Sequence, residues 1–104
     1  MHKVYIVGAG PGAPDLITVR GMDLLRRADV LIYAGSLVNP ALVEESGAGL
    51  KLDSQKMTLE DIADAVEVHV RAGELVVRLH SGNPSLDGAI VEQMAEFGRR
   101  GIGA

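Results

Sequence analysis

A run of small residues from Gly8 to Ala13 has the spacing of a loop that brings backbone N–H groups close to a ligand. It reads GAGPGA after the apolar stretch KVYIV and matches G-x-G-x-x-G/A, the pattern of phosphate-binding turns. Pro11 and Pro14, however, favour an extended loop where a dinucleotide site requires a helix to begin. The acidic residue expected about twenty residues further on is also missing, since Ala34 to Ser36 stands there. The pattern therefore favours another small ligand over a dinucleotide, and also over a loop with no ligand.

A second candidate loop, His80 to Gly88 (HSGNPSLDG), follows the last apolar run of the chain. In open α/β sheets, ligands bind outside the carboxyl ends of the strands, so loops that follow neighbouring strands line one crevice. The alternative is a loop that only turns the chain, in which Ser85 caps the next helix while Gly82 and Pro84 shape the backbone. Considered alone, this segment leaves both interpretations open.

A third small-residue segment runs from Tyr33 to Val38 (YAGSLV). It would let a bulky planar substrate approach, but an ordinary turn between strand and helix is the preferred interpretation. The three histidines, His2, His69 and His80, are far apart in sequence, and no two have the spacing of metal ligands on one helix face. We expect no metal, and we expect His69 to face solvent.

Short apolar runs with β-branched residues predict the strands that position these loops. Such runs stand at Lys3 to Val7, Asp29 to Tyr33 and Glu74 to Leu79, and Gly49 to Leu52 is a weaker candidate. Since the first and last of these strands precede the two ligand loops, we expect the first strand to be central and to lie beside the last.

Helical periodicity separates the strands. Thr18 to Ala28, Thr58 to Arg71 and Ser85 to Arg100 are amphipathic, and Pro40 to Glu45 is a shorter helix with Asn39 as its cap. Alternating strands and helices predict one α/β domain over residues 1–104, a parallel sheet flanked by helices on both faces. The alternation would next place a fifth strand after Gly101, so the chain reads as part of a longer protein.

Composition excludes several classes of protein. Ten Lys and Arg against 14 Asp and Glu give a net charge of −4, and aromatic residues are only 3%, which disfavours binding to nucleic acid. The absence of cysteine excludes disulfide scaffolds and thiolate sites. No apolar run is long enough for a signal peptide or a membrane span. We expect a cytoplasmic protein without membrane partners.

The three loops and their neighbours carry motifs that occur together in one known family. V-G-A-G-P-G-x-x-x-L-[LI]-T stands at Val7 to Thr18, and A-D-V at Ala28 to Val30. Y-A-[GD]-S-L-V, R-L-H-S-G and G-A-I-x-E-Q-M stand at Tyr33 to Val38, Arg78 to Gly82 and Gly88 to Met94. The set resembles the tetrapyrrole methylases, and within them the branch that methylates C11 of precorrin-4 or cobalt-precorrin-4 in cobalamin biosynthesis. It covers essentially the whole chain, but only the amino-terminal half of such an enzyme.

This resemblance implies that S-adenosylmethionine binds in a cleft between two α/β domains, of which this chain is the amino-terminal one. By matching position, it places cofactor contacts on Pro11, Ser81, Gly82, Asn83 and Leu86. Substrate contacts, with a precorrin or cobalt-precorrin, are expected at Gly10, Gly12, Tyr33 and Ser36. No catalytic side chain is implied, because the electron-rich ring carbon of the substrate itself attacks the methyl group, while the protein supplies orientation and a dry pocket.

Two positions depart from the family pattern, since Asn83 replaces the aspartate of G-D-P and Asp87 stands where Tyr or Phe is usual. Ala34 stands where some uroporphyrinogen methylases have an aspartate, as the resemblance to the C11 branch implies, so no general base is expected there. We expect this half of an enzyme to bind the cofactor poorly alone and to form a homodimer. Two alternatives from other classes are another nucleotide-binding α/β enzyme and a non-catalytic interaction domain.

Overall fold

The fold is an α/β sandwich with a parallel sheet in the middle, as the sequence predicts. The computed structural model describes residues 2–9, 17–81 and 89–104. Within these residues, four parallel strands lie in the order β1-β4-β2-β3. They are β1 (Tyr5–Gly8), β2 (Val30–Tyr33), β3 (Leu50–Asp53) and β4 (Val76–His80). The weakest candidate, Gly49 to Leu52, is therefore confirmed as a strand.

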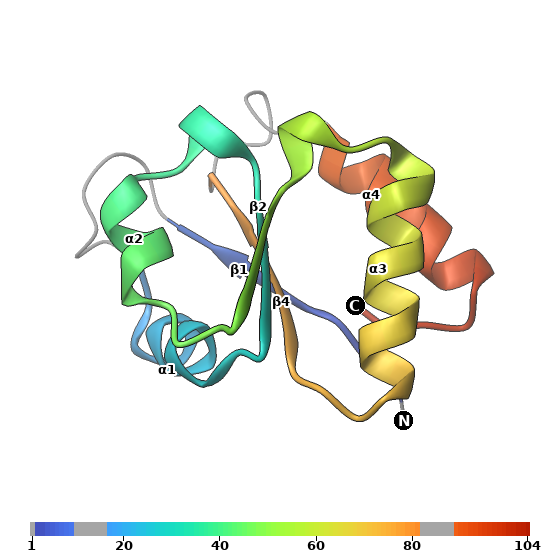
Figure 1. Cartoon of the computed structure of the whole chain (residues 1–104), viewed down its shortest axis with the longest axis horizontal. Helices are drawn as coiled ribbons and strands as arrows, with labels where there is room; N and C mark the ends of the chain where they lie inside the picture. The colour runs from blue at the N-terminus through green and yellow to red at the C-terminus, as the bar shows by residue number, and fades with distance from the viewer. Residues whose placement is uncertain (1, 10–16, 82–88) are drawn as a thin grey trace.

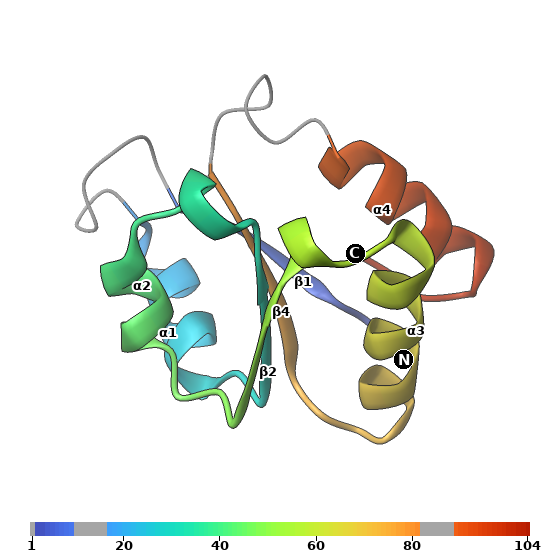
Figure 2. The same cartoon turned by 45° about the horizontal axis from the view of Figure 1, so that its top comes forward.

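Two pairs of helices cover the two faces of the sheet (Figures 1 and 2). α1 (Val19–Arg27) and α2 (Pro40–Glu45) lie on one face, and α3 (Leu59–Arg71) and α4 (Ala89–Arg99) lie on the other. Two single 3-10 turns, η2 (Gly35–Leu37) and η3 (Ser54–Lys56), follow β2 and β3 at the carboxyl edge. The expected start of the last helix at Ser85 lies outside the described residues.

The position of β1 differs from the prediction. β1 does pair with β4, as the arrangement of the loops requires, but β4 and β2 occupy the interior of the sheet. The residues of β4 from Val76 to Leu79 are fully buried, which suits a strand paired on both sides. On its other side β1 is met by an isolated bridge near its start, where Val4 N donates to Gly103 O at 2.9 Å. The expectation that the first strand is central among these four is therefore wrong.

Alternation along the strands divides the apolar core into two clusters. Val30, Ile32 and Val76 face α3 and α4, where they join Phe97 and the inner side of α3. Leu31, Val77 and Leu79 face α1 and α2, and join Leu25 and Leu42. Both faces of the two central strands are thus sealed, which fixes the register of the sheet and the direction of each loop that leaves it.

The helix boundaries follow from capping groups present in the sequence. Thr18 Oγ1 and Asn39 Oδ1 accept from the N–H groups of Gly21 and Ala41, each at 2.9 Å. Thr58 and Asp61 form a reciprocal capping box at the start of α3. Gly73, with φ +84°, ends α3 in the left-handed conformation that a residue with a side chain rarely adopts.

Three side chains do not lie where the sequence suggests. Val19 and Met94 share helical spacing with the buried residues of their helices, which predicts that they face the core, but Val19 is 90% exposed and Met94 is 41% exposed. His69 does not simply face solvent, since its Nδ1 lies 3.0 Å from Glu74 Oε1 and the ring is half-buried.

Candidate functional site

The carboxyl ends of β1 and β4 lie side by side, so the two glycine-containing loops leave the sheet at adjacent points. Gly8 is in register with His80, and Ala9 N donates to His80 O at 2.8 Å. This confirms that the two strands are neighbours. Most of the predicted contacts fall within residues 10–16 and 82–88 and lie outside the described residues; they are Gly10, Pro11, Gly12, Gly82, Asn83 and Leu86.

Ser81 is the predicted cofactor contact that the structure describes. It follows β4 directly and is only 5% exposed, although it is polar. Its neighbours at the edge are Gly8 and Ala9, and none of the three carries a side chain longer than a hydroxymethyl group. A ligand can therefore approach the backbone closely at this point.

The predicted substrate contacts Tyr33 and Ser36 lie at the carboxyl end of β2, the other neighbour of β4. Tyr33 is in register with Leu79, and its half-buried ring packs with the cluster on the α1 and α2 face. Ser36 is exposed in η2. The three loops that the sequence singled out thus begin at one edge of the sheet.

A side chain that the sequence did not single out, Gln55 of η3, holds this third loop in place. Its Oε1 accepts from Ser36 N at 3.4 Å, and the backbone N–H of Gln55 donates to Asp53 Oδ1 at 3.0 Å. Gly35 has φ +38°, and a Cβ at this position would overlap the Gln55 amide oxygen. The positive φ is the reason for glycine at position 35, and a larger residue would in addition displace the flexible Gln55 side chain from Ser36 N.

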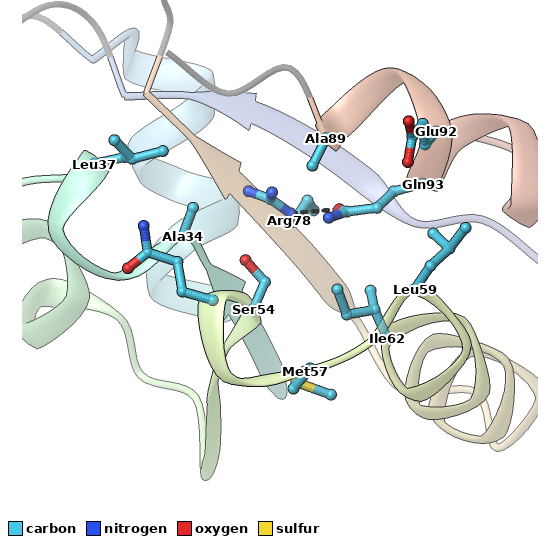
Figure 3. Close-up of a pocket in the computed structure, with 11 residues that line it drawn as sticks. Ala34, Leu37, Ser54, Met57, Leu59, Ile62, Arg78, Ala89, Glu92 and Gln93 are labelled. Carbon is cyan, nitrogen blue, oxygen red and sulfur yellow. Dashed lines mark hydrogen bonds between the residues drawn. The ribbon is translucent and has the colours of Figure 1, made fainter.

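A cavity of about 310 Å³ opens at this edge on the α3 and α4 face (Figure 3). It lies between η2, η3, the start of α3 and the start of α4, above β4. Leu37, Met57, Leu59 and Ile62 give it apolar walls, while Arg78, Glu92 and Gln93 supply polar groups. Because Tyr33 packs on the opposite face of the sheet, it lies away from this cavity.

Arg78 forms the floor of the cavity although it lies inside a β-strand. The residue has no exposed surface, and its Nε donates to Gln93 Oε1 at 2.8 Å. Its Nη1 donates to Leu79 O at 2.6 Å. Gln93 is itself only 3% exposed on the inner face of α4. The sequence alone did not lead us to predict a role for either residue. Two features could have indicated one: Arg78 is a charged residue within the apolar run ELVVRL, and Gln93 is an amide on the apolar face of a helix.

A second hollow of about 240 Å³ lies beside the end of β1 and the first turn of α1. Gly21 belongs to its lining, and a Cβ there would come within 3.0 Å of Val7 Cγ1 and Thr18 Oγ1. The glycine lets the start of α1 lie close to β1 and thereby shapes the same edge of the sheet.

The described residues hold no group of three or more His, Asp or Glu side chains close enough to ligate a metal ion. Within the same part of the chain, no helix combines the length and the apolar composition needed to cross a bilayer.

Comparison with known families identifies the family to which the chain belongs. Residues 3–104 match the family model of the Tetrapyrrole (Corrin/Porphyrin) Methylases. The chain belongs to the tetrapyrrole methylase family. This confirms the resemblance on which the site residues were assigned, while their individual roles stay predictions.

Relatives in this family are similar over nearly all of the chain. The cobalt-precorrin-4 C(11)-methyltransferase of Methanocaldococcus jannaschii is 50% identical over 97% of the chain. The precorrin-4 C(11)-methyltransferase of Pseudomonas aeruginosa is 48% identical over 95%. The matches cover 39% and 40% of those relatives, so this tetrapyrrole methylase chain spans about two fifths of their length.

Solved structures share the fold. A cobalt precorrin-4 methyltransferase superposes with a TM-score of 0.87 and 46% identity, covering 98% of this chain and 45% of its own. A uroporphyrin-III C-methyl transferase from Thermus thermophilus, complexed with S-adenyl homocysteine, gives a TM-score of 0.79 and 34% identity, covering 97% and 45%. Both likenesses extend over nearly the whole of this chain.

Proposed function

We propose that this tetrapyrrole methylase chain forms the amino-terminal domain of an enzyme that methylates C11 of precorrin-4 or cobalt-precorrin-4 in cobalamin biosynthesis. The observation that carries the proposal is the juxtaposition of β1 and β4, which starts both glycine-containing loops at one edge. Its specificity rests on the 50% identity to a cobalt-precorrin-4 C(11)-methyltransferase.

The proposed reaction makes limited demands on the side chains. S-adenosylmethionine, when bound, supplies an activated methyl group, and the electron-rich ring carbon attacks it in line, so that a carbon–carbon bond forms as the carbon–sulfur bond breaks. The protein has to orient the two reactants and exclude water. A sheet edge with short side chains, flanked by a partly apolar cavity, suits that task.

The assignment of individual contacts is part of the proposal. The cofactor is assigned to the edge formed by β1 and β4, through Pro11, Ser81, Gly82, Asn83 and Leu86. The substrate is assigned to Gly10, Gly12, Tyr33 and Ser36. The position of Ser81 beside Gly8 and Ala9 supports the first assignment, since these three residues have short side chains at the edge where both glycine-containing loops begin.

We further propose that the enzyme works as a homodimer in the cytoplasm, without a metal ion, nucleic acid or membrane as partner. The cysteine-free composition and the net charge of −4 support the compartment and the lack of affinity for nucleic acid.

A chimeric enzyme tests the function. This chain replaces the matched part of the M. jannaschii relative, and the product is incubated with cobalt-precorrin-4 and S-adenosylmethionine. We expect mass spectrometry to show one added methyl group, and calorimetry to show binding of S-adenosylhomocysteine but not of NADH. The unaltered relative is the positive control. Binding of NADH without S-adenosylhomocysteine, or methylation of uroporphyrinogen III alone, would contradict the proposal.

A further inference from the structure

We infer that two copies of this chain pair along the free edge of β3, in an antiparallel arrangement that sets Lys51 of each copy opposite the partner's Asp53. The inference gives the proposed homodimer a defined surface, and it rests on that part of the proposed function and not on methyl transfer. β3 stands last in the strand order, beside β2 (Figures 1 and 2), and pairs with no other strand of the described residues.

The backbone of β3 shows which of its groups are available to a partner. Leu50 N donates to Asp29 O at 3.4 Å, so the N–H and C=O groups of Leu50 point towards β2. Because these groups alternate in direction along a strand, those of Leu52 also point towards β2, while those of Lys51 and Asp53 point to the free edge. An unpaired row of such groups is a template for another strand.

Charge selects one register for this pairing. Since Lys51 and Asp53 carry the outward groups, a two-fold antiparallel pair that overlaps most of the strand is centred on Lys51, Leu52 or Asp53. Centring on Lys51 sets two lysines directly opposite each other, and centring on Asp53 sets two aspartates opposite, which is unfavourable in both cases. Centring on Leu52 sets Lys51 opposite the partner's Asp53 twice, and each of these pairs exchanges two backbone hydrogen bonds.

The two charged side chains are free to make this contact. They stand two residues apart and therefore share one face of the sheet. The side chain of Lys51 is exposed and forms no ion pair or hydrogen bond with the rest of the described chain. The carboxylate of Asp53 accepts from Gln55 N through Oδ1 at 3.0 Å, which leaves its second oxygen able to accept from a lysine.

The other face of β3 adds an apolar contact. In this register Leu52, which is half-buried in the single chain, lies at the two-fold axis opposite the partner's Leu52. Leu50 stands at the diagonal position on the same face, and it is 37% exposed in the single chain. Pairing therefore removes apolar surface from water on one face of the strand while it joins opposite charges on the other.

The arrangement favours a second copy over an unrelated strand. A lysine on a short edge strand normally prevents pairing with other chains. Here that charge is compensated by a strand that carries an acid at the matching position, and β3 is itself such a strand. Because β3 has four residues, the interface is small, and we expect the 104-residue chain to dimerise with a dissociation constant of roughly 0.1–1 mM.

Two charge reversals test the register. In Lys51→Asp the facing positions are all acidic, and in Asp53→Lys they are all basic, so each variant alone should dimerise at least about tenfold more weakly than the wild type. Mixed together, the two variants should form a one-to-one dimer, because every acid then faces a lysine. Sedimentation velocity over about 10 µM to 1 mM measures both effects. Arg20→Asp reverses an exposed charge on α1, beside the opposite edge strand β1, and should dimerise like the wild type.

Amide hydrogen exchange locates the contact. The N–H groups of Lys51 and Asp53 should exchange more slowly as the concentration rises through the dimerisation range, whereas those of Leu50 and Leu52 bond within the chain and should not change. Lys51→Asp removes no side-chain contact within the described fold, so its melting temperature should be kept. Its loss of the dimer tests the inference by itself if Asp53→Lys, which removes the acceptor of Gln55 N, does not fold.

The inference is overturned if the wild type stays monomeric at about 1 mM or if the mixed variants do not pair. A dimer with unchanged exchange at Lys51 and Asp53 also overturns it, because the contact then lies on another surface. If the chimera protects these amides as a monomer, another part of the enzyme covers the edge and the inference is wrong. The proposed reaction is judged separately: a chimera that methylates cobalt-precorrin-4 without pairing through β3 retains the function while this inference fails.

Discussion

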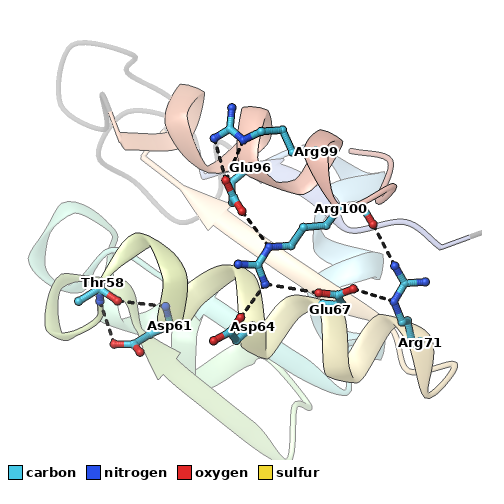
Figure 4. Close-up of polar contacts among 8 residues, drawn as sticks. All are labelled: Thr58, Asp61, Asp64, Glu67, Arg71, Glu96, Arg99 and Arg100. Carbon is cyan, nitrogen blue, oxygen red and sulfur yellow. Dashed lines mark hydrogen bonds and ion pairs between the residues drawn. The ribbon is translucent and has the colours of Figure 1, made fainter.

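Arg100 Nη1 donates to Asp64 Oδ1 at 2.6 Å and thereby ties the end of α4 to the middle of α3 (Figure 4). The same guanidinium donates from Nε to Glu96 Oε2 at 2.9 Å. Arg71 completes the link by donating to the backbone oxygen of Arg100. Since α3 and α4 both contribute walls to the cavity, this contact helps to fix the spacing of the candidate site.

Arg100→Met should lower the melting temperature of the chain by a few degrees at low salt. Arg100 is 19% exposed and joins two helices, so its ion pairs are stronger than isolated surface pairs, although Asp64 is 67% exposed and remains well screened. The difference from wild type should shrink as salt rises towards ~1 M. Thermal denaturation at several salt concentrations measures both effects. Arg99→Met is the matched control, because Arg99 contacts only Glu96 on its own helix among the described residues, and it should change less.

Part of the stability of the α3–α4 pair should depend on pH, because it comes from the ionised carboxylate of Glu96. Hydrogen bonds from Arg100 and then Arg99 hold the pKa of Glu96 below its ordinary value of 4.5. A carboxylate whose pKa is lowered by folding stabilises the protein above its unfolded pKa, and this contribution is lost as pH falls through the folded pKa. The difference in unfolding free energy between wild type and Glu96→Gln should therefore be constant near neutral pH, shrink as the pH falls below 4.5, and vanish once the pH has passed below the lowered pKa of folded Glu96. Urea denaturation across this range measures it, and a pH-independent difference would show that the ion pairs do not contribute.

The elements of the fold were predictable because their signals are local. The apolar runs of β1, β2 and β4, the capping box of Thr58 and the glycine after α3 each depend on residues within a few positions of one another. The order of the strands was not predictable in the same way. A run such as KVYIV has the same composition whether it lies at an edge or in the interior, and packing of the helices decides between these positions.

The cavity could not be predicted from local sequence patterns either. Arg78 and Gln93 are fifteen residues apart, and each looks misplaced on an apolar face until the fold brings them together. The contact between Gly35 and Gln55 likewise joins η2, which follows β2, to η3, which follows β3. The three ligand loops, by contrast, were found from sequence because short motifs of small residues at strand ends carry their own signal.

Gly35→Ala should destabilise the chain by about 1–2 kcal/mol, since an alanine in the left-handed region is strained by roughly this amount. It should also push the Gln55 amide away from Ser36 N, because the new Cβ would overlap it. Gly73→Ala is a control for the first effect alone, since it has φ +84° and no atom within 4 Å of the added Cβ. Gly49→Ala has neither problem and should be neutral or slightly stabilising.

Urea denaturation ranks these three glycine variants, and the amide signal of Ser36 reports the position of Gln55. Equal stability of Gly35→Ala and Gly49→Ala would contradict the role given to Gly35. If Gly35→Ala is less stable but its Ser36 amide signal is unchanged, backbone strain alone accounts for the loss of stability.

The 104-residue chain alone should bind S-adenosylhomocysteine about tenfold or more weakly than the chimera that supplies the rest of the relative. The chain spans 39% of the M. jannaschii enzyme. Ligand sites of this size gain affinity by enclosing most of the ligand, whereas the cost of immobilising the ligand is the same for an open edge as for a closed cleft. The sheet edge at Gly8, Ala9 and Ser81 offers one wall of such a cleft. Calorimetric titration of both proteins, with NADH as the negative control, measures the ratio. Equal affinity in the two proteins would show that this chain holds the whole cofactor site.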